Sequence, residues 1–436
     1  MRRCGFTRLT LRSCAPTLGI LVFTGGIAEP ACAQGLPRAK PEDVGLSSAA
    51  LARIAPTLRV YTDSVRLPGI VMAVARHGKL VHLEAVGVSD IQRALPMRTD
   101  AVFRIYSMTK AVTGAAIAQL IERGALRLDD PVSKYIPAFA DVKVFAGGST
   151  ASPTLRAPTR VITIAHLLTH SAGLTYGLFG NSPVDSLYSR AQLLSAPMTV
   201  AQFADSIARL PLLFDPGSKW NYSMAMDVLG RVVEVAGGKS FDRYLDDELF
   251  TPLGMLETGF HVKPSMEGRI VTLYGRGVGG ALSASPALIG PEYRAEGRMF
   301  AGGSGLLSTA ADYLRFTQML LNGGELDGRR VLKRETVALM MRNLLSPELT
   351  PITPPPLGNK LGYGQGFGGV VMLDSVAAAM PTSPGVYRWC GVAGTFFFVD
   401  RAKDLIGMVW TQVYGACPHP LETQFERLVY AAIAGK

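Results

Sequence analysis

The chain has 436 residues, of which 48% are hydrophobic and only 18% are charged. This composition can bury a large core, so it excludes a disordered chain, and the length allows two or three domains or one large two-lobed enzyme. The formal net charge is +10, but no run of five or more basic residues occurs, so we expect no nucleic-acid partner.

The first 33 residues have the pattern of a secretory signal peptide. Four arginines among the first 12 residues precede an apolar stretch over 15–28, and Ala31-Cys32-Ala33 is a small-x-small cleavage site. The apolar stretch is shorter than the ~20 residues that span a bilayer. We therefore predict an exported protein, periplasmic or secreted, whose mature chain begins at residue 34 and makes no stable membrane insertion.

Only Cys390 and Cys417 remain after cleavage of the predicted signal peptide. Two cysteines are too few for a disulfide framework, and no CxxC metal site is present. The two residues flank what looks like a hairpin, so they could pair, but two buried unpaired thiols are an equally good interpretation.

The first half of the mature chain begins with a predicted helix over 47–65, capped by Ser47. A β-hairpin over 69–88 follows, with its turn at His77-Gly78, and then a long helix over 107–123. Residues 140–160 are rich in Gly, Ser and Pro and predict a loop.

The rest of the chain alternates further helices with a proline-rich segment and two strands. Five prolines over 346–358 predict a rigid surface loop. Strands are expected over 389–399 and 405–413. Helices are expected over 164–170, 224–235, 312–321 and 421–434.

Strands thus cluster at both ends of the chain and helices fill the middle. We predict an α/β (α+β) fold in which one sheet is built from both termini, is flanked by helices and carries an inserted, mainly helical lobe. The sheet lobe is expected over about 34–106 and 290–436, and the helical lobe over about 107–289.

Several catalytic patterns are absent or unconvincing. The chain has no GxSxG nucleophile elbow and no HExxH zinc motif. His166 and His170 are four residues apart, but no acid follows at ligand spacing, so we expect structural histidines and no metal. Residues 275–280 match GxGxxG formally, yet no long helix follows, so we expect a flexible loop and no dinucleotide cofactor.

The informative motif is Ser107-Met-Thr-Lys110, an SxxK sequence at the start of the long predicted helix. Side chains at i and i+3 lie on one helix face and can touch. A serine hydroxyl needs a base to become a nucleophile, and a nearby lysine can supply or assist one. Of the twelve lysines, only Lys110 has a serine three residues before it.

Around this motif the sequence resembles the serine β-lactamases, the penicillin-binding DD-peptidases and the β-lactamase-like esterases called esterase family VIII. Five segments carry the resemblance, which extends over about residues 40–430. They are Phe103–Lys110 (FRIYSMTK), Ala165–Leu174 (AHLLTHSAGL), Phe214–Ser223 (FDPGSKWNYS), Ala301–Asp312 (AGGSGLLSTAAD) and Trp389–Gly391 (WCG).

Two departures favour the esterase branch of this family. Where lactamases and peptidases have Tyr-x-Asn, this chain has Tyr222-Ser223-Met224, so the amide that binds an acylamide side chain is missing. Where they have Lys-Thr-Gly, this chain has Trp389-Cys390-Gly391, so the cation that holds a substrate carboxylate is missing.

The resemblance implies a role for each catalytic residue. Ser107 would be the acylated nucleophile and Tyr222 the general base, with Lys110 either assisting Tyr222 or acting as the base itself. The backbone N–H groups of Ser107 and Val392 would hold the oxyanion.

The substrate would contact Trp389, Gly391 and Met224. No metal or organic cofactor is implied. The expected activity is hydrolysis of short-chain acyl esters, and the expected partner is a small-molecule ester. The alternatives are a β-lactamase or D-Ala-D-Ala peptidase (an amide hydrolase of the same fold) and, from another class, a non-catalytic binding protein. The sequence leaves the oligomeric state open.

Overall fold

The computed structural model describes residues 35–285, 299–350 and 362–434, together with Met1, Gly5, Tyr293 and Ile352. The predicted signal peptide and most of the proline-rich 346–358 segment therefore lie outside the described residues. Within the described part, no helix combines the length and the apolar character needed to cross a bilayer.

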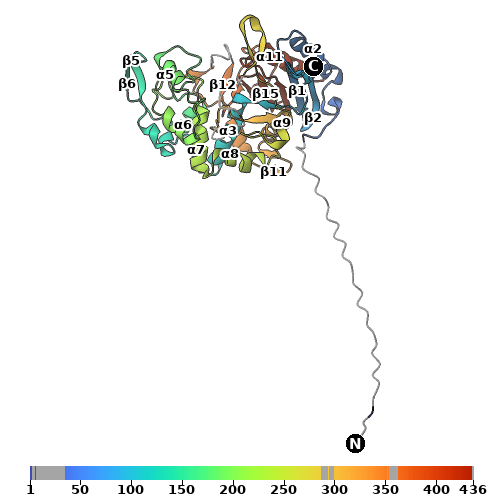
Figure 1. Ribbon diagram of the computed structural model, residues 1–436, viewed down its shortest axis with the longest axis horizontal. Helices are drawn as coiled ribbons and strands as arrows, with labels where there is room; N and C mark the ends of the chain where they lie inside the picture. The colour runs from blue at the N-terminus through green and yellow to red at the C-terminus, as the bar shows by residue number, and fades with distance from the viewer. Residues whose placement is uncertain are drawn as a thin grey trace. The chain divides into compact units, whose positions relative to one another are not determined.

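The core of the fold is an eight-stranded antiparallel sheet with the order β12-β13-β14-β15-β16-β1-β2-β3 (Figure 1). Strand β16 pairs with β1, so strands from the two ends of the chain meet inside the sheet. This arrangement confirms the predicted fold class. The strands are β1 (Gly69–Arg76), β2 (Lys79–Asp90), β3 (Leu95–Pro96), β12 (Tyr363–Gln365), β13 (Val370–Met372), β14 (Tyr387–Gly391), β15 (Thr395–Asp400) and β16 (Leu405–Trp410).

Helices cover both faces of this sheet, and the alternation of side chains along β15 shows how. The Phe397 ring lies 5.2 Å from that of Tyr313 in α9 (Ala310–Leu321). The next residue, Phe398, points to the opposite face and stacks at 5.6 Å on Tyr430 of α11 (Pro420–Ala431). Because both faces are buried, the strand is apolar at nearly every position instead of alternating with polar residues.

The middle of the chain forms the helical region that lies to the left of the sheet in Figure 1. Its central pair is α3 (Thr109–Glu122) and α7 (Ala225–Gly237), which pack against each other. Gly238 ends α7 in the left-handed conformation that favours glycine. The helical region also contains α4 (Ile164–Leu168), α5 (Pro183–Ala191), α6 (Val200–Ile207) and α8 (Phe241–Leu245). The remaining described helices, outside the middle of the chain, are α1 (Ser48–Leu51), α2 (Ile54–Asp63) and α10 (Arg334–Met340).

Short helical turns and small two-stranded ribbons connect these elements. One ribbon, β4 with β9, joins the residues just before Ser107 to those that precede α9. The short turns are η1 (Pro41–Val44), η2 (Tyr106–Met108), η3 (Val132–Lys134), η4 (Pro137–Ala140), η5 (Asp246–Phe250), η6 (Pro264–Met266), η7 (Val278–Gly280) and η8 (Pro347–Leu349). The ribbon strands are β4 (Val102–Arg104), β9 (Leu307–Thr309), β5 (Val144–Gly148), β6 (Pro153–Arg156), β7 (Tyr274–Arg276), β8 (Leu282–Ala284), β10 (Glu325–Leu326) and β11 (Arg329–Arg330).

The single strand predicted over 389–399 is wrong, because this segment forms two strands. Strands β14 and β15 are joined by the three-residue turn Val392-Ala393-Gly394, in which Gly394 has φ = 87° and donates its N–H to Gly391 O at 2.8 Å. A three-residue hairpin loop with a left-handed glycine is a common turn type. Gly394 was therefore the sequence signal that separates the two strands.

Three other predictions over the first 285 residues differ from the structure. The loop predicted over 140–160 contains the hairpin β5–β6, held in place where Phe145 N donates to Leu212 O at 2.9 Å. The helix predicted over 47–65 is interrupted between α1 and α2, although Ser47 caps α1 as expected. The flexible loop predicted over 275–280 lies in the hairpin β7–β8. Of the proline-rich segment, Pro347–Leu349 forms a short 3-10 turn.

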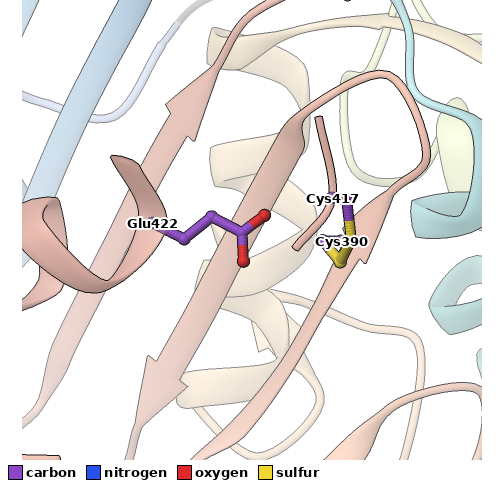
Figure 2. Close-up of side chains that lie close together, drawn as sticks. All are labelled: Cys390, Cys417 and Glu422. Atoms are coloured by element: carbon purple, nitrogen blue, oxygen red, sulfur yellow. A yellow bond between two sulfur atoms is a disulfide. The ribbon is translucent and has the colours of Figure 1, made fainter. Parts of the chain in front are cut away.

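Cys390 and Cys417 form a disulfide, which settles the alternative that the sequence left open. Figure 2 shows the buried carboxylate of Glu422 beside them, with the ligand atoms of the three residues within 4.8 Å of one another. Sulfurs joined to each other are not the thiolates that bind a metal. Glu422 instead lies near the buried Arg388, whose guanidinium pairs with Glu426 at 2.8 Å.

We expect this disulfide to contribute to stability. It closes a loop between residues that are 27 positions apart. A crosslink of that span lowers the conformational entropy of the unfolded chain and so raises the free energy of unfolding by about 3–4 kcal/mol. The double variant Cys390→Ser/Cys417→Ser should therefore lose up to that much free energy of unfolding in urea titrations. Dithiothreitol should destabilise the wild type by a similar amount and leave the double variant unchanged. Equal destabilisation of both proteins by the reductant would contradict this role.

Candidate active site: Ser107, Lys110 and Tyr222

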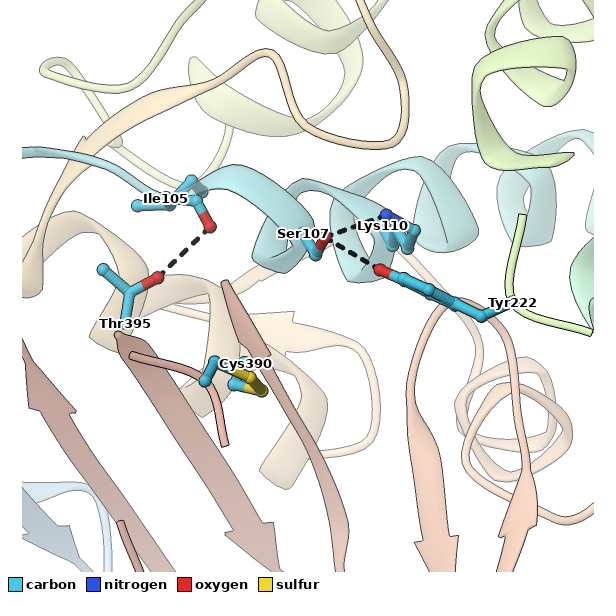
Figure 3. Close-up of a disulfide and its surroundings, with 7 residues drawn as sticks. Ile105, Ser107, Lys110, Tyr222, Cys390 and Thr395 are labelled. Atoms are coloured by element: carbon cyan, nitrogen blue, oxygen red, sulfur yellow. Dashed lines mark hydrogen bonds between the residues drawn. A yellow bond between two sulfur atoms is a disulfide. The ribbon is translucent and has the colours of Figure 1, made fainter. Parts of the chain in front are cut away.

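Ser107 lies at the junction between the 3-10 turn η2 and helix α3. The residue before it, Tyr106, is buried and has φ = 42°, a left-handed conformation that a bulky side chain rarely adopts. Such backbone outliers persist where the surrounding structure enforces them, often at functional sites. Here the preceding carbonyl, that of Ile105, accepts a hydrogen bond from Thr395 Oγ1 of β15 at 3.2 Å (Figure 3).

The structure brings the three predicted catalytic side chains together, although Tyr222 is 115 residues away from Ser107 in the chain. The Tyr222 hydroxyl donates to Ser107 Oγ at 2.8 Å, and Lys110 Nζ donates to the same oxygen at 3.0 Å (Figure 3). Both distances are within the range for transfer of a proton from the serine. The arrangement can therefore activate Ser107 as a nucleophile.

Lys110 is completely buried, so its amino group depends on protein partners. Besides Ser107, it donates to the backbone carbonyl of Gly303 at 2.6 Å. It also lies over the aromatic faces of Tyr222 and Tyr176, at 4.8 and 5.5 Å from the ring centroids. Aromatic faces attract cations, so the two rings are further partners of this buried amino group.

Tyr222 precedes α7 by two residues and is held among other aromatic rings. His170 lies 4.9 Å from its ring and Trp389 lies 5.5 Å away. Burial holds the pKa of His170 well below its usual range, so this imidazole is neutral, and its Nδ1 lies 3.3 Å from Ser223 Oγ. His170 thus packs against the base candidate without adding charge.

His166, the other half of the predicted histidine pair, has a local role. Its Nδ1 accepts a hydrogen bond from Thr163 N at 3.2 Å, while the backbone N–H of His166 donates to Thr163 Oγ1. This reciprocal pair caps the start of α4. One ring nitrogen of His166 thus accepts a hydrogen bond from the backbone, which is a structural role, as expected.

Ser107 opens onto an apolar pocket of about 540 Å³, including its open mouth. The described residues that line this pocket are all uncharged, and most are aromatic or aliphatic. They are Tyr106, Ser107, Tyr176, Leu178, Phe179, Tyr222, Ser304, Trp389, Cys390, Val392, Tyr414 and Cys417. The disulfide is thus part of the pocket wall, and the site suits a neutral organic group better than a carboxylate.

The other predicted site residues fall in three different places. Trp389 and Val392 line the catalytic pocket. Gly391 packs so closely that a Cβ there would lie 2.3 Å from Ile105 O, which explains why only glycine fits. Met224 does not line this pocket: it lies in an adjacent hollow that shares the walls Tyr176 and Leu178.

Sequence reasoning missed four parts of the site. Tyr176 and Phe179 come just after the segment that ends at Leu174, and their pocket role has no separate signal in the sequence. Gly303 lies inside the family-like segment over 301–312, and its role comes from its carbonyl, which any residue type carries. Asp227 lies in the first turn of α7, where an acid commonly stabilises only the start of a helix.

Comparisons with known proteins agree with this geometry. A family model described as Beta-lactamase matches residues 54–430. Esterase EstB of Burkholderia gladioli is 32% identical over 388 residues, which cover 84% of this chain and 91% of the esterase. EstCE1, a hydrolase with promiscuous acyltransferase activity, has a TM-score of 0.75 at 27% identity and covers 88% of this chain and 99% of its own. Simvastatin synthase (LovD) from Aspergillus terreus has the same TM-score at 25% identity, over 88% of this chain and 98% of its own. The chain therefore belongs to the Beta-lactamase family, and it is a serine hydrolase.

Proposed function

We propose that this protein is a serine carboxylesterase that hydrolyses neutral short-chain acyl esters through an acyl-enzyme at Ser107. The observation that carries the proposal is the hydrogen-bonded set Ser107, Lys110 and Tyr222 at the base of an uncharged, aromatic pocket. A binding protein would not need a serine held by two proton-transfer partners. The esterase relatives support the same reading.

In the proposed reaction, the phenolate form of Tyr222 takes the proton of Ser107 while Oγ attacks the ester carbonyl carbon. The resulting oxyanion accepts hydrogen bonds from the N–H groups of Ser107 and Val392. The turn that carries Val392 is fixed because Val392 O accepts from Gly415 N at 2.9 Å. The tetrahedral intermediate then expels the alcohol, which takes the proton from Tyr222, and water releases the acid by the same steps in reverse order.

The ester preference over β-lactams and peptides rests on what lines the pocket. Those substrates carry a carboxylate, and a carboxylate needs a cation or several donors when it is desolvated. Trp389 presents an apolar ring at the place where the family pattern has a lysine, and the other described residues of the pocket wall are uncharged.

Transfer of the acyl group to an alcohol is a second candidate activity. The apolar pocket wall can hold an alcohol near the acyl-enzyme as well as water, and EstCE1 is described as a hydrolase with promiscuous acyltransferase activity. Adding a short alcohol to the assay would show it as formation of a new ester at the expense of free acid.

Export to the periplasm or the medium is also part of the proposal. It rests on the signal-like first 33 residues and on the disulfide, since disulfides persist mainly in oxidising compartments. Mass spectrometry of the protein recovered from its host would test it, with a mature N-terminus at Gln34 expected. An intact N-terminus in a cytoplasmic fraction would contradict export.

Replacing Trp389 by lysine tests the substrate class. A lysine can offer one charge-assisted hydrogen bond to a carboxylate, which is worth roughly 1.5–3 kcal/mol, or about 10–150-fold. Trp389→Lys should lower kcat/KM for nitrophenyl butyrate and raise it for nitrocefin, while the wild type favours the ester over nitrocefin and a D-Ala-D-Ala peptide.

Trp389→Leu is the matched control, because it removes the ring without adding a charge. It should lower ester hydrolysis without improving nitrocefin hydrolysis. If neither variant changes the ratio of the two kcat/KM values, residue 389 does not set the substrate class. A wild type that prefers nitrocefin or the peptide would overturn the proposed function itself.

A further inference from the structure

A buried carboxylate that the reaction above does not use lies next to the catalytic lysine. Asp227 is the third residue of α7 and is 1% exposed. Its Oδ1 accepts the N–H of Gly303 at 2.8 Å, and the carbonyl of the same glycine accepts Lys110 Nζ at 2.6 Å. Its other oxygen, Oδ2, has no hydrogen-bond partner among the residues that the structure describes. One residue, Gly303, thus separates the carboxylate from the ammonium group, with its N–H bonded to the acid and its carbonyl bonded to the lysine.

The packing around Gly303 is specific for this arrangement. A Cβ at residue 303 would lie 2.5 Å from Asp227 Oδ2, so only glycine lets the backbone approach the acid this closely. The neighbouring Gly302 is similarly restricted, since its Cβ would lie 2.5 Å from Met226 O. The two successive glycines therefore allow the backbone that accepts the Lys110 hydrogen bond to pack closely against the first turn of α7.

The charges in this region explain what the acid can do. Burial raises the pKa of Asp227 to about 6, while the positive charge of Lys110 acts in the opposite direction. Three other titratable groups face the pair. His170 is neutral because burial lowers its pKa, and Tyr176 is neutral because burial, Tyr222 and Asp227 raise its pKa. The third is Tyr222, the proposed base. Above about pH 6, Asp227 is therefore the negative charge that balances the buried lysine.

We propose that Asp227 is a positioning residue that keeps Lys110 in its charged form, acting through the peptide of Gly303. This inference rests on the proposed function and adds to it a choice of base. A lysine that is held as an ammonium ion cannot accept the proton of Ser107, so that role falls to Tyr222. The lysine then favours the tyrosinate by its charge, since an adjacent cation stabilises an anion.

The chain offers a closely matched control in Asp312. This residue is also the third residue of its helix, α9, and is fully buried. Within the described part of the chain, one of its carboxylate oxygens has no hydrogen-bond partner. Burial raises its pKa to about 6 as well. Its bonded oxygen accepts from Glu257 N at 2.7 Å and Thr258 Oγ1 at 2.9 Å. Asp312→Asn should therefore cost stability much as Asp227→Asn does, without touching the catalytic lysine.

The experiment measures kcat/KM for nitrophenyl butyrate and the rate of labelling by a fluorophosphonate for the wild type, Asp227→Asn and Asp312→Asn, from about pH 5 to about pH 10. Without its counter-charge, Lys110 should lose its proton more easily. The alkaline limb of the Asp227→Asn profile should therefore move to lower pH, by about one unit or more. The loss relative to wild type should be small below about pH 6, where Asp227 is protonated, and should increase with pH toward about 10-fold for each unit of that shift. The Asp312→Asn profile should keep the wild-type shape.

An unchanged pH profile in folded Asp227→Asn, or an equal shift in Asp312→Asn, would overturn the proposal. A general loss of folding is recognised by equal losses at every pH and by lower thermal stability. The labelling rate separates this proposal from the proposed function, because it requires a reactive serine but no particular substrate. A wild type that is labelled but does not hydrolyse the ester would refute the ester substrate, while the pH shift in labelling would still decide the role of Asp227.

Discussion

Replacing Ser107 by alanine is expected to remove nearly all ester hydrolysis, by about 10⁴-fold or more, because no acyl-enzyme can form. The side chain that is lost is small, and among the described residues its oxygen is hydrogen-bonded only to the two groups that activate it. The fold should therefore persist, which circular dichroism and thermal unfolding would verify. Intact-mass spectrometry after treatment with a fluorophosphonate gives a direct readout: the wild type should gain one label and Ser107→Ala none.

A second serine in the pocket makes this test specific. Ser304 also lines the cavity and is buried, so a reagent that labels any serine there would find it as well. Ser304→Ala should still be labelled, since it retains Ser107. Labelling that persists in Ser107→Ala and disappears in Ser304→Ala would transfer the nucleophile role to the other serine.

The active site was predictable where its chemistry is local in the sequence. Ser107 and Lys110 lie three residues apart at a helix start, so their contact follows from helix geometry. Tyr222 comes from the segment before α7, far from Ser107 in the sequence, and only the resemblance to a known family pointed to it. Asp227 could not be found in this way. Its contact with the lysine runs through the backbone of Gly303, and the sequence does not show how close two segments approach.

The fold was predictable to the extent that it follows from local patterns. The β1–β2 hairpin and the helices α3, α7, α9 and α11 have clear periodicity and caps. The hairpin β5–β6 depends on the bond between Phe145 and Leu212, which are distant in the sequence, and its own residues resemble a loop. The β14–β15 turn was missed for a different reason. Its neighbours are apolar on both faces, so no change of period marks it, and only Gly394 does.

The disulfide could be predicted from the sequence only in part. The number of cysteines left a pair and two free thiols equally open, because no local pattern fixes the distance between residues 390 and 417. The sheet fixes it. Cys390 is on β14, and the chain leaving β16 turns back so that Val413 N and Gly415 N donate to Ala393 O and Val392 O, each at 2.9 Å. These bonds bring Cys417 beside the strand, so the crosslink secures the same turn that presents Val392 to the substrate.

Lys110→Ala and Tyr222→Phe are each expected to lower kcat/KM by at least the ~10²–10⁴-fold that is typical of general acid–base groups. Both side chains bond the same oxygen of Ser107, and the lysine lies 4.8 Å from the ring of the tyrosine. If Lys110 acts by making Tyr222 a better base, the lysine contributes nothing once the tyrosine hydroxyl is gone. The double variant should then be little worse than either single variant.

Tyr176→Phe is the control for this comparison. Its ring also faces Lys110, at 5.5 Å, but its hydroxyl interacts with Tyr222 and makes no bond to Ser107 in the described site, so the variant should lose less than about 10-fold. Steady-state kinetics on nitrophenyl butyrate for the four variants gives the interaction free energy between Lys110 and Tyr222 directly. Losses that multiply in the double variant would mean that the two residues act independently. In that case Lys110 would have a separate task at Ser107, and the assignment of the base to Tyr222 would have to be abandoned.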